Sequence, residues 1–287
     1  MKRTQIFCLV LVLILVISNT FAKPVEDTTF VVPEVDLSIL NAPPRYKNEV
    51  YQKRLDSLTK QIPLDYNNYV QAYIDLYAYR RREQVERMLG LSEYYFPMVE
   101  KVFKEYNIPT EFKYLAIVES ALNPYAVSYV GATGMWQFMF TTAKMYNLEI
   151  TSHVDERRDP YLATHGAAKY FVDMYRRYGD WLLVIAAYNC GPGNVNKAIR
   201  KAGGGKKTFW EIRQYLPQET RGYVPAYIAA TYIMNCAESH NIYPTYPNFS
   251  FLTDTVHITR PVRFNDVNKL CGVNLEELKV LNPIFKK

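Results

Sequence analysis

The sequence predicts a mainly α-helical fold, because apolar residues recur at helical spacing over most of the chain. In the first such stretch they stand at positions 51, 55, 58 and 62, and such steps of three and four residues mark one face of a helix. Strand-like alternation occurs only late, at 249–251 and 256–258. Apolar residues make up 49% of the chain and charged residues 22%, which excludes a disordered chain and predicts a substantial core.

The expected helices follow one another along the chain, each ended by a residue that disfavours continuation. The first begins at Tyr46 and ends at Pro63, and the second runs from about Val70 until Gly90 stops it. A third follows Ser92 and breaks at 107–109, and a short, very apolar fourth runs from a Thr110 cap to Leu122. Further helices are expected near 134–147, 160–178, 180–189, 194–202, 208–216 and 224–239, with a capping box at 208–211.

The first 22 residues have the pattern of a cleaved secretory signal. Lys2 and Arg3 precede an apolar run from Ile6 to Ile17, and the segment ends on the small residue Ala22. The run is about a dozen residues, whereas a membrane-spanning helix needs roughly 18 or more; an uncleaved anchor is the alternative. Residues 23–45 are rich in proline and acids and are expected to form a flexible leader. The protein is therefore expected to be exported, to the periplasm or cell envelope.

Charge and cysteine content exclude several classes of function. Lys2 and Arg3 are among 34 basic residues, and 28 residues are acidic, so the cleaved chain carries about +4. The basic residues form scattered clusters without a stripe, which argues against nucleic acid and suits an acidic extracellular polymer. The three cysteines that remain, at 190, 236 and 271, form no CxxC pair, and the four histidines show no ligand spacing. We expect no metal and no cofactor.

Glu119 is the candidate catalytic residue. It follows Leu115 by four residues and precedes Leu122 by three, so its carboxylate is expected on the apolar face of the fourth helix. Burial disfavours the charged form and raises the pKa of a carboxyl group, which is what a general acid needs when it protonates a glycosidic oxygen. Spacing alone leaves open a glutamate that reaches solvent or caps a neighbouring helix.

Four short motifs in order give the surroundings of Glu119. They are Glu119-Ser120, Gly134-Met-Trp-Gln137, Ala187-Tyr188-Asn189 and Glu219-Thr-Arg-Gly-Tyr223-Val. Over about residues 93–245 the chain resembles the soluble lytic transglycosylase (SLT) domain of the lysozyme-like superfamily, which includes goose-type lysozyme. The second motif departs from the common Gly-Leu-Met-Gln, which leaves the shape of the nearby subsite open. The helical segment before it resembles the type-D membrane-bound lytic transglycosylases, back to about Tyr46.

The resemblance implies cleavage of the β-1,4 bond between N-acetylmuramic acid and N-acetylglucosamine in peptidoglycan, with formation of a 1,6-anhydro ring. Glu119 would protonate the leaving oxygen and then, as carboxylate, take the proton of the C6 hydroxyl. The substrate's N-acetyl group would shield the anomeric carbon in place of a second carboxylate. The residues that would bind substrate or brace the cleft are Ser128, Gln137, Tyr188, Asn189, Glu219 and Tyr223.

Each supporting residue also has a plain structural reading. Tyr188 could pack in the core, Gln137 could satisfy a loop carbonyl, and Glu219 could be a surface acid. All three tryptophans, Trp136, Trp181 and Trp210, are expected in the core, and Trp136 is the one of them best placed to meet sugar. The rival functions are a hydrolytic muramidase, in which water replaces the C6 hydroxyl, and a non-catalytic wall-binding protein.

The expected organisation has five parts: a signal at 1–22, a leader at 23–45, a helical extension at 46–92, an SLT catalytic domain at 93–246 and a small segment at 247–287. The last resembles part of a LysM peptidoglycan-binding module, with a strand at 256–258, two short helices and Leu281-Asn-Pro283. It is expected either to bind glycan or to pack against the body. The expected partners are peptidoglycan strands and the membrane surface of the envelope, not nucleic acid, and the chain is expected to be a monomer.

Overall fold

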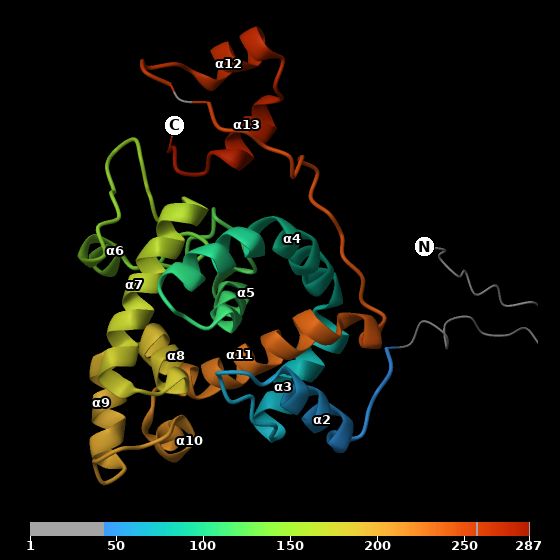
Figure 1. The fold of residues 1–287 in the computed structure, drawn as a ribbon, viewed down its shortest axis with the longest axis vertical. Coiled ribbons are helices and arrows are strands. Elements are labelled where there is room, and N and C mark those ends of the chain that lie inside the picture. The colour runs from blue at the N-terminus through green and yellow to red at the C-terminus, as the bar shows by residue number, and fades with distance from the viewer. Residues whose placement is uncertain (1–42, 257, 287) are drawn as a thin grey trace, which may run out of the picture. The chain divides into compact units, whose positions relative to one another are not determined.

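The computed structural model describes residues 43–256 and 258–286, and Figure 1 shows them as helices joined by turns. The expected signal at 1–22 and most of the leader at 23–45 lie outside the described residues. Within the described ranges the structure has isolated β-bridges and no named strand, so the mainly α fold class is confirmed. None of the described helices is both long and apolar enough to cross a membrane.

The first helices cover one side of the body. They are α2 (Asn48–Leu58), α3 (Asn68–Asp75), whose first amides bond to the Asn67 side chain, and the π-helical η1 (Leu76–Arg80). α3 packs against α11 (Gln218–Cys236), which runs through the middle of the body in Figure 1. Gly222 of α11 lies at this contact, where any side chain would have to displace the Tyr73 hydroxyl.

The helix α4 (Arg82–Glu105) runs through Gly90, so the expected helix stop at Gly90 is wrong. The chain stays helical through Gly90 and through Pro97, so the last part of the second expected helix is continuous with the third. The second expected helix is instead interrupted at Arg81, before α4 begins. Gly90 is buried, and a Cβ at this position would overlap the main-chain carbonyl of Thr245. The amide of Thr245 donates to the Glu86 carbonyl at 2.9 Å. The glycine therefore permits a close approach of two chain segments instead of ending a helix.

The central part of the chain forms the rest of the body. In order it contains η2 (Thr110–Tyr114), α5 (Leu115–Ser120), α6 (Phe140–Met145), α7 (Pro160–Tyr178), α8 (Trp181–Cys190), α9 (Pro192–Lys201), α10 (Phe209–Ile212), η3 (Arg213–Tyr215), α11 and η4 (Ala237–His240). Aspartates cap α7 and α8, and the capping box of Thr208 and Glu211 is confirmed. The helix expected at 134–147 is only α6, because residues 126–138 form turns and bridges instead.

The C-terminal segment contains α12 (Phe264–Cys271) and α13 (Leu275–Leu281). The strand expected at 256–258 is absent from its described residues: Val256 and Ile258 are 77% and 51% exposed and pair with no other segment, while residue 257 lies outside the description. The end of the segment pairs instead with the loop before α7. The Asp155 amide donates to the Ile284 carbonyl and the Lys286 amide to the His153 carbonyl, each at 2.9 Å.

A buried histidine gives the fold an acid-sensitive point. His240 is fully buried, its Nε2 lies 3.0 Å from the Tyr232 hydroxyl, and burial with the nearby Arg54 and Arg82 lowers its pKa to about 4. The unfolded chain, with an ordinary histidine pKa, takes up the proton first as pH falls. Stability contributed by neutral His240 is therefore nearly complete above about pH 6.5 and is lost progressively toward pH 4, by about 3 kcal/mol.

This prediction is tested by melting temperature against pH for the wild type and His240→Gln. The comparison of slopes is needed because Glu119, with a raised pKa, contributes an opposite slope in much of the same window. We expect the wild type to lose more stability than the variant between pH 6.5 and 4. Parallel curves would contradict the assignment.

Candidate active site

Glu119 lies in the last turn of α5, whose residues 115–117 are buried in the core. The chain then turns sharply, since Ala121 and Leu122 both adopt left-handed conformations with φ of 54° and 63°. This turn ends the helix directly after the Glu119-Ser120 motif. Residues other than glycine rarely adopt such angles, so the surrounding packing must hold the turn in place.

The carboxyl group of Glu119 is in an environment that favours its protonated form. Burial raises its pKa to about 7, the hydrogen bond that the Tyr223 hydroxyl donates to Oε1 opposes this rise, and the negative charge of Glu219 adds to it. The raised pKa expected from the apolar helix face is thus found in the structure. At neutral pH a large fraction of Glu119 carries a proton that it can give to a substrate oxygen.

Residues 126–138, here called the motif loop, carry the second motif and are tied to the helices of the first and third. The Ser120 hydroxyl donates to the Met135 carbonyl at 2.9 Å, and the Tyr188 hydroxyl to the Trp136 carbonyl at 2.6 Å. Gly134 has φ of 86°, and a Cβ there would overlap the Arg157 carbonyl oxygen, so only glycine fits. Motifs that lie far apart in the sequence therefore meet around one loop.

Gln137 ends the second motif in a left-handed conformation, with φ of 48°. Its Nε2 donates to the carbonyls of Gly134 at 2.8 Å and Ala126 at 3.2 Å. Both donors of the amide are thus used within the motif loop, and this matches the structural reading given to the residue. The side-chain oxygen has no hydrogen-bond partner among the described residues and is the group that can face a ligand.

Two tyrosines stand beside Glu119. Burial, and then the charge of Glu119, raise the pKa of both Tyr188 and Tyr223 well above 10, so both hydroxyls remain donors at neutral pH. Tyr223 is 7% exposed and bonds to the carboxyl directly. Tyr188 packs against the rings of Tyr170 and Phe171, with centroids 5.2 and 5.1 Å apart. Tyr188 therefore combines the packing role with a polar contact.

The other predicted residues form no hydrogen bond to the carboxyl group in the described structure. Ser128 Oγ accepts the Ala132 amide at 3.0 Å within the motif loop, and no bond joins it to Glu119 in the described structure. Asn189 Oδ1 accepts the Thr220 hydroxyl at 2.7 Å, which links the third motif to the fourth. Glu219 is exposed in the first turn of α11 and acts on Glu119 through its charge.

The expected core position of Trp136 is confirmed, and its fully buried side chain is not available to meet sugar. Its Nε1 donates to Thr164 Oγ1 at 2.9 Å, and its ring packs against Phe103 and Phe171. Sequence reasoning missed Ser120 and Thr220 as the groups that join the motifs. Their only signal was their place inside two of those motifs.

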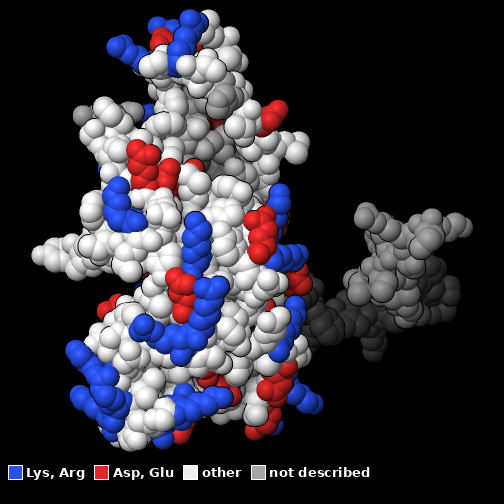
Figure 2. Space-filling view, turned by 60° about the vertical axis from the view of Figure 1, so that its left-hand side comes forward, with Lys and Arg blue, Asp and Glu red and all other residues white. Residues whose placement is uncertain are grey.

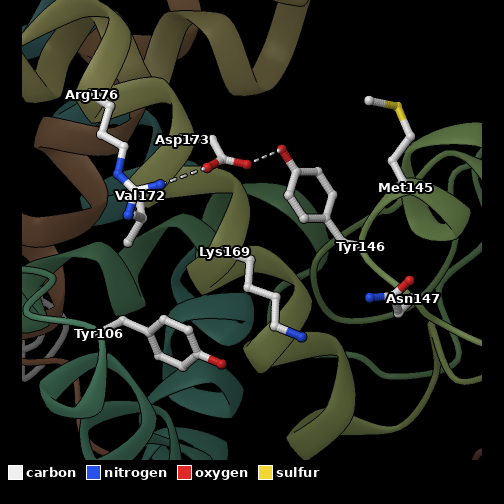
Figure 3. A pocket seen from close by; sticks show the side chains of 8 residues that line it. All are labelled: Tyr106, Met145, Tyr146, Asn147, Lys169, Val172, Asp173 and Arg176. Atoms are coloured by element: carbon white, nitrogen blue, oxygen red, sulfur yellow. Dashed lines mark hydrogen bonds and ion pairs between the residues drawn. The ribbon is translucent and has the colours of Figure 1, made fainter.

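The part of the chain that the structure describes holds no group of three or more His, Cys, Asp and Glu side chains suited to a metal ion. A surface cavity of about 330 Å³ lies elsewhere, between α4, the end of α6 and α7 (Figure 3). Asp173 in this cavity already accepts Tyr146 at 3.2 Å and pairs with Arg176 at 3.5 Å. Figure 2 shows basic and acidic side chains interspersed over the face that it presents.

Two known family models each match a part of the chain. Residues 98–210 match the transglycosylase SLT domain, and residues 252–287 match the LysM-like domain of lytic transglycosylase MltD. The chain therefore carries an SLT domain followed by an MltD-type LysM-like domain, which confirms the resemblance drawn from the four motifs and the C-terminal pattern.

Individual relatives extend this result. Over 220 residues, 72% of this chain and 48% of the relative, the chain is 34% identical to membrane-bound lytic murein transglycosylase D of Escherichia coli. It is 32% identical over 145 residues to soluble lytic murein transglycosylase of the same organism, covering 47% of this chain and 22% of that one. The chain spans about half the length of the first relative. The crystal structure of the 70 kDa soluble lytic transglycosylase of E. coli aligns with a TM-score of 0.40 and 28% identity, covering 50% of this chain and 25% of that one.

Proposed function

We propose that this protein is a peptidoglycan lytic transglycosylase, with Glu119 as its single acid and base. The observation that carries the proposal is the carboxyl group of Glu119, held at a pKa of about 7 beside Tyr223 within an SLT domain. The bond cleaved is the β-1,4 bond between N-acetylmuramic acid and N-acetylglucosamine. The relatives named lytic murein transglycosylase D and soluble lytic murein transglycosylase support this substrate class.

The reaction needs one carboxyl group used twice. Protonated Glu119 gives its proton to the glycosidic oxygen as the bond to the anomeric carbon breaks, and the N-acetyl group of the substrate shields that carbon. The carboxylate then takes the proton of the C6 hydroxyl as this oxygen attacks the anomeric carbon and closes the 1,6-anhydro ring. The attack is intramolecular, so proximity lowers its barrier, and Glu119 regains its starting form.

The surrounding groups support these steps. Tyr223 stabilises the carboxylate that forms after the first proton transfer, because its hydroxyl donates to Oε1. Tyr188 holds the motif loop through the Trp136 carbonyl, and the free side-chain oxygen of Gln137 binds the sugar near the cleaved bond. Ser128 and Asn189 line or brace the cleft. We further propose peptidoglycan strands as the partner and the bacterial cell envelope as the location.

The products test the proposal against its rivals. Purified sacculi are digested with the protein, and the masses of the released fragments are measured by mass spectrometry. A lytic transglycosylase releases fragments lighter by one water than hydrolytic fragments, since the anhydro ring replaces a reducing end. Fragments with reducing ends would identify a hydrolytic muramidase, and binding to sacculi without release would identify a wall-binding protein.

The pH dependence of turnover follows from the Glu119 pKa. The first step needs the protonated acid, so kcat/KM should fall as pH rises through about 7. Tyr223→Phe removes a hydrogen bond that lowers this pKa, so the alkaline limb of the pH–rate profile should move to higher pH. Glu219→Gln removes a charge that raises it and should move the limb to lower pH.

Kinetics on soluble glycan fragments between pH 5 and 9 measure these shifts. Glu83→Gln is the matched control, because Glu83 is an exposed acid on α4 that pairs with Arg87. It should leave the limb in place. Shifts of the two active-site variants in the same direction would contradict the assignment of the limb to Glu119.

A further inference from the structure

A buried ion pair lies behind the motif loop. Asp155 and Arg157 have side chains 3% and 9% exposed, and Arg157 Nη2 lies 2.8 Å from Asp155 Oδ2. Arg157 Nε also donates to Asp155 Oδ1 at 2.9 Å, so the pair is bidentate. Burial opposes the charge on Asp155, but the bonds from Arg157 keep the net pKa of that carboxyl below its ordinary value. Two charges are thus kept in the interior in a fixed geometry.

The remaining hydrogen bonds of the Arg157 side chain go to the motif loop. Its Nη1 donates to the carbonyls of Gly131 at 3.1 Å and Phe138 at 3.2 Å, which stand at either end of residues 131–138. Its own main-chain carbonyl lies against Gly134, where a Cβ would overlap it. Arg157 therefore touches this stretch at its beginning, its middle and its end.

The stretch held in this way carries Gln137. Within it the Thr133 and Phe138 main chains bond to each other at 3.0 and 3.1 Å, and Gln137 keeps its left-handed conformation between them. An isolated left-handed residue is strained, so it persists only where its surroundings fix it. Asp155 orients the guanidinium group, and the guanidinium group fixes the two carbonyls that flank Gln137.

We propose that Asp155 and Arg157 are positioning residues for the glycan cleavage proposed above, holding Gln137 in register with Glu119 through the motif loop. Neither touches the reacting atoms. A misplacement of about 1 Å at a reacting centre lowers the rate by up to about a hundredfold. Loss of the Asp155–Arg157 pair, here called the clamp, therefore lowers turnover while the fold persists. The expected loss of turnover rests on the proposed function, whereas the expected loosening of the motif loop does not.

The test is a double-mutant cycle between Arg157→Lys and Gln137→Ala. Lysine keeps the positive charge but lacks the planar fork that binds Asp155 and both carbonyls. We expect Arg157→Lys to lower kcat/KM about tenfold with a melting temperature within a few degrees of wild type. In the Gln137→Ala background it should have almost no further effect, because both changes act on the same group.

The controls separate positioning from general stability. Arg176→Ala removes one partner of an exposed pair with Asp173 and should leave kcat/KM unchanged. If Arg157→Lys does not fold, Asp155→Asn takes its place, since it removes the charge that orients the arginine and keeps the shape. Fully multiplicative losses in the cycle would overturn the proposal, as would wild-type turnover in a folded Arg157→Lys protein.

Amide hydrogen exchange gives a reading that does not depend on the reaction. In Arg157→Lys the amides of Thr133 and Phe138 should exchange at least about tenfold faster, while those of α8 keep wild-type protection. If the wild-type protein releases no glycan, faster exchange in the motif loop of Arg157→Lys would refute the proposed function and still support the clamp. Unchanged exchange in the loop would overturn the clamp even in an active enzyme.

Discussion

Glu119→Gln is expected to lower glycan cleavage by at least about a thousandfold while the protein stays folded. Glutamine has the same shape and can still accept the Tyr223 hydroxyl, but it can neither give the proton to the leaving oxygen nor take one from the C6 hydroxyl. General acid–base catalysis contributes roughly 10² to 10⁴ in rate, and here one group carries both transfers. The measurement is the initial rate of fragment release from sacculi, together with the melting temperature.

Glu111→Gln is the matched control for this variant. Glu111 is a second buried acid only a short distance earlier in the chain, in η2, and its Oε1 has no hydrogen-bond partner in the described structure. The same chemical change there should leave turnover within about twofold of wild type. A Glu119→Gln protein that keeps wild-type turnover would remove Glu119 from the mechanism. Equal losses in both variants would point to a general effect of changing buried acids.

Gly134→Ala is expected to have the second largest effect, lowering kcat/KM at least about a hundredfold. The new methyl group would overlap the Arg157 carbonyl oxygen, which belongs to the main chain and cannot move aside as a side chain could. The motif loop must therefore shift, and it carries Gln137 and the carbonyls that hold Ser120 and Tyr188. Steady-state kinetics on soluble glycan fragments measure the loss.

Gly131→Ala separates the overlap from the backbone angle. Gly131 has nearly the same φ, 84° against 86° at Gly134, but a Cβ at Gly131 would meet no atom within 4 Å. Both variants bear the cost of a left-handed alanine, about 1–2 kcal/mol; only Gly134→Ala adds the overlap. We expect Gly131→Ala to lower stability by that amount, seen in urea unfolding, with little loss of turnover. Equal losses of turnover in the two variants would contradict the role given to the close approach at Gly134.

The sequence was sufficient to predict the helical class and Glu119 on its helix because both depend on local spacing. Apolar periodicity follows from burial of one helix face, and the capping box of Thr208 and Glu211 is a short-range signal. The motifs indicated which residues gather near Glu119. They did not indicate how, since the bonds from Ser120 to Met135 and from Tyr188 to Trp136 join segments far apart in the sequence.

The features that the sequence did not predict come from contacts of the same long-range kind. Gly90 looked like a helix stop, but its lack of a side chain serves the approach of Thr245. Trp136 was expected in the core, but its spacing did not indicate that the indole would donate to Thr164. Arg157 looked like one of several scattered basic residues until its partners at Asp155, Gly131 and Phe138 became visible. A composition or a spacing cannot predict which main-chain carbonyl a side chain will reach.

Direct titration of the Glu119 carboxyl group tests the central claim, that this residue is an acid poised near neutral pH. The side-chain carboxyl carbons are labelled with ¹³C, and the Glu119 signal is identified as the one missing from Glu119→Gln. Its chemical shift is then followed from pH 3 to 9. We expect a midpoint near pH 7. A midpoint near the ordinary value for an exposed glutamate, about 4.3, would mean that Glu119 is fully ionised at neutral pH and would contradict its role as the proton donor.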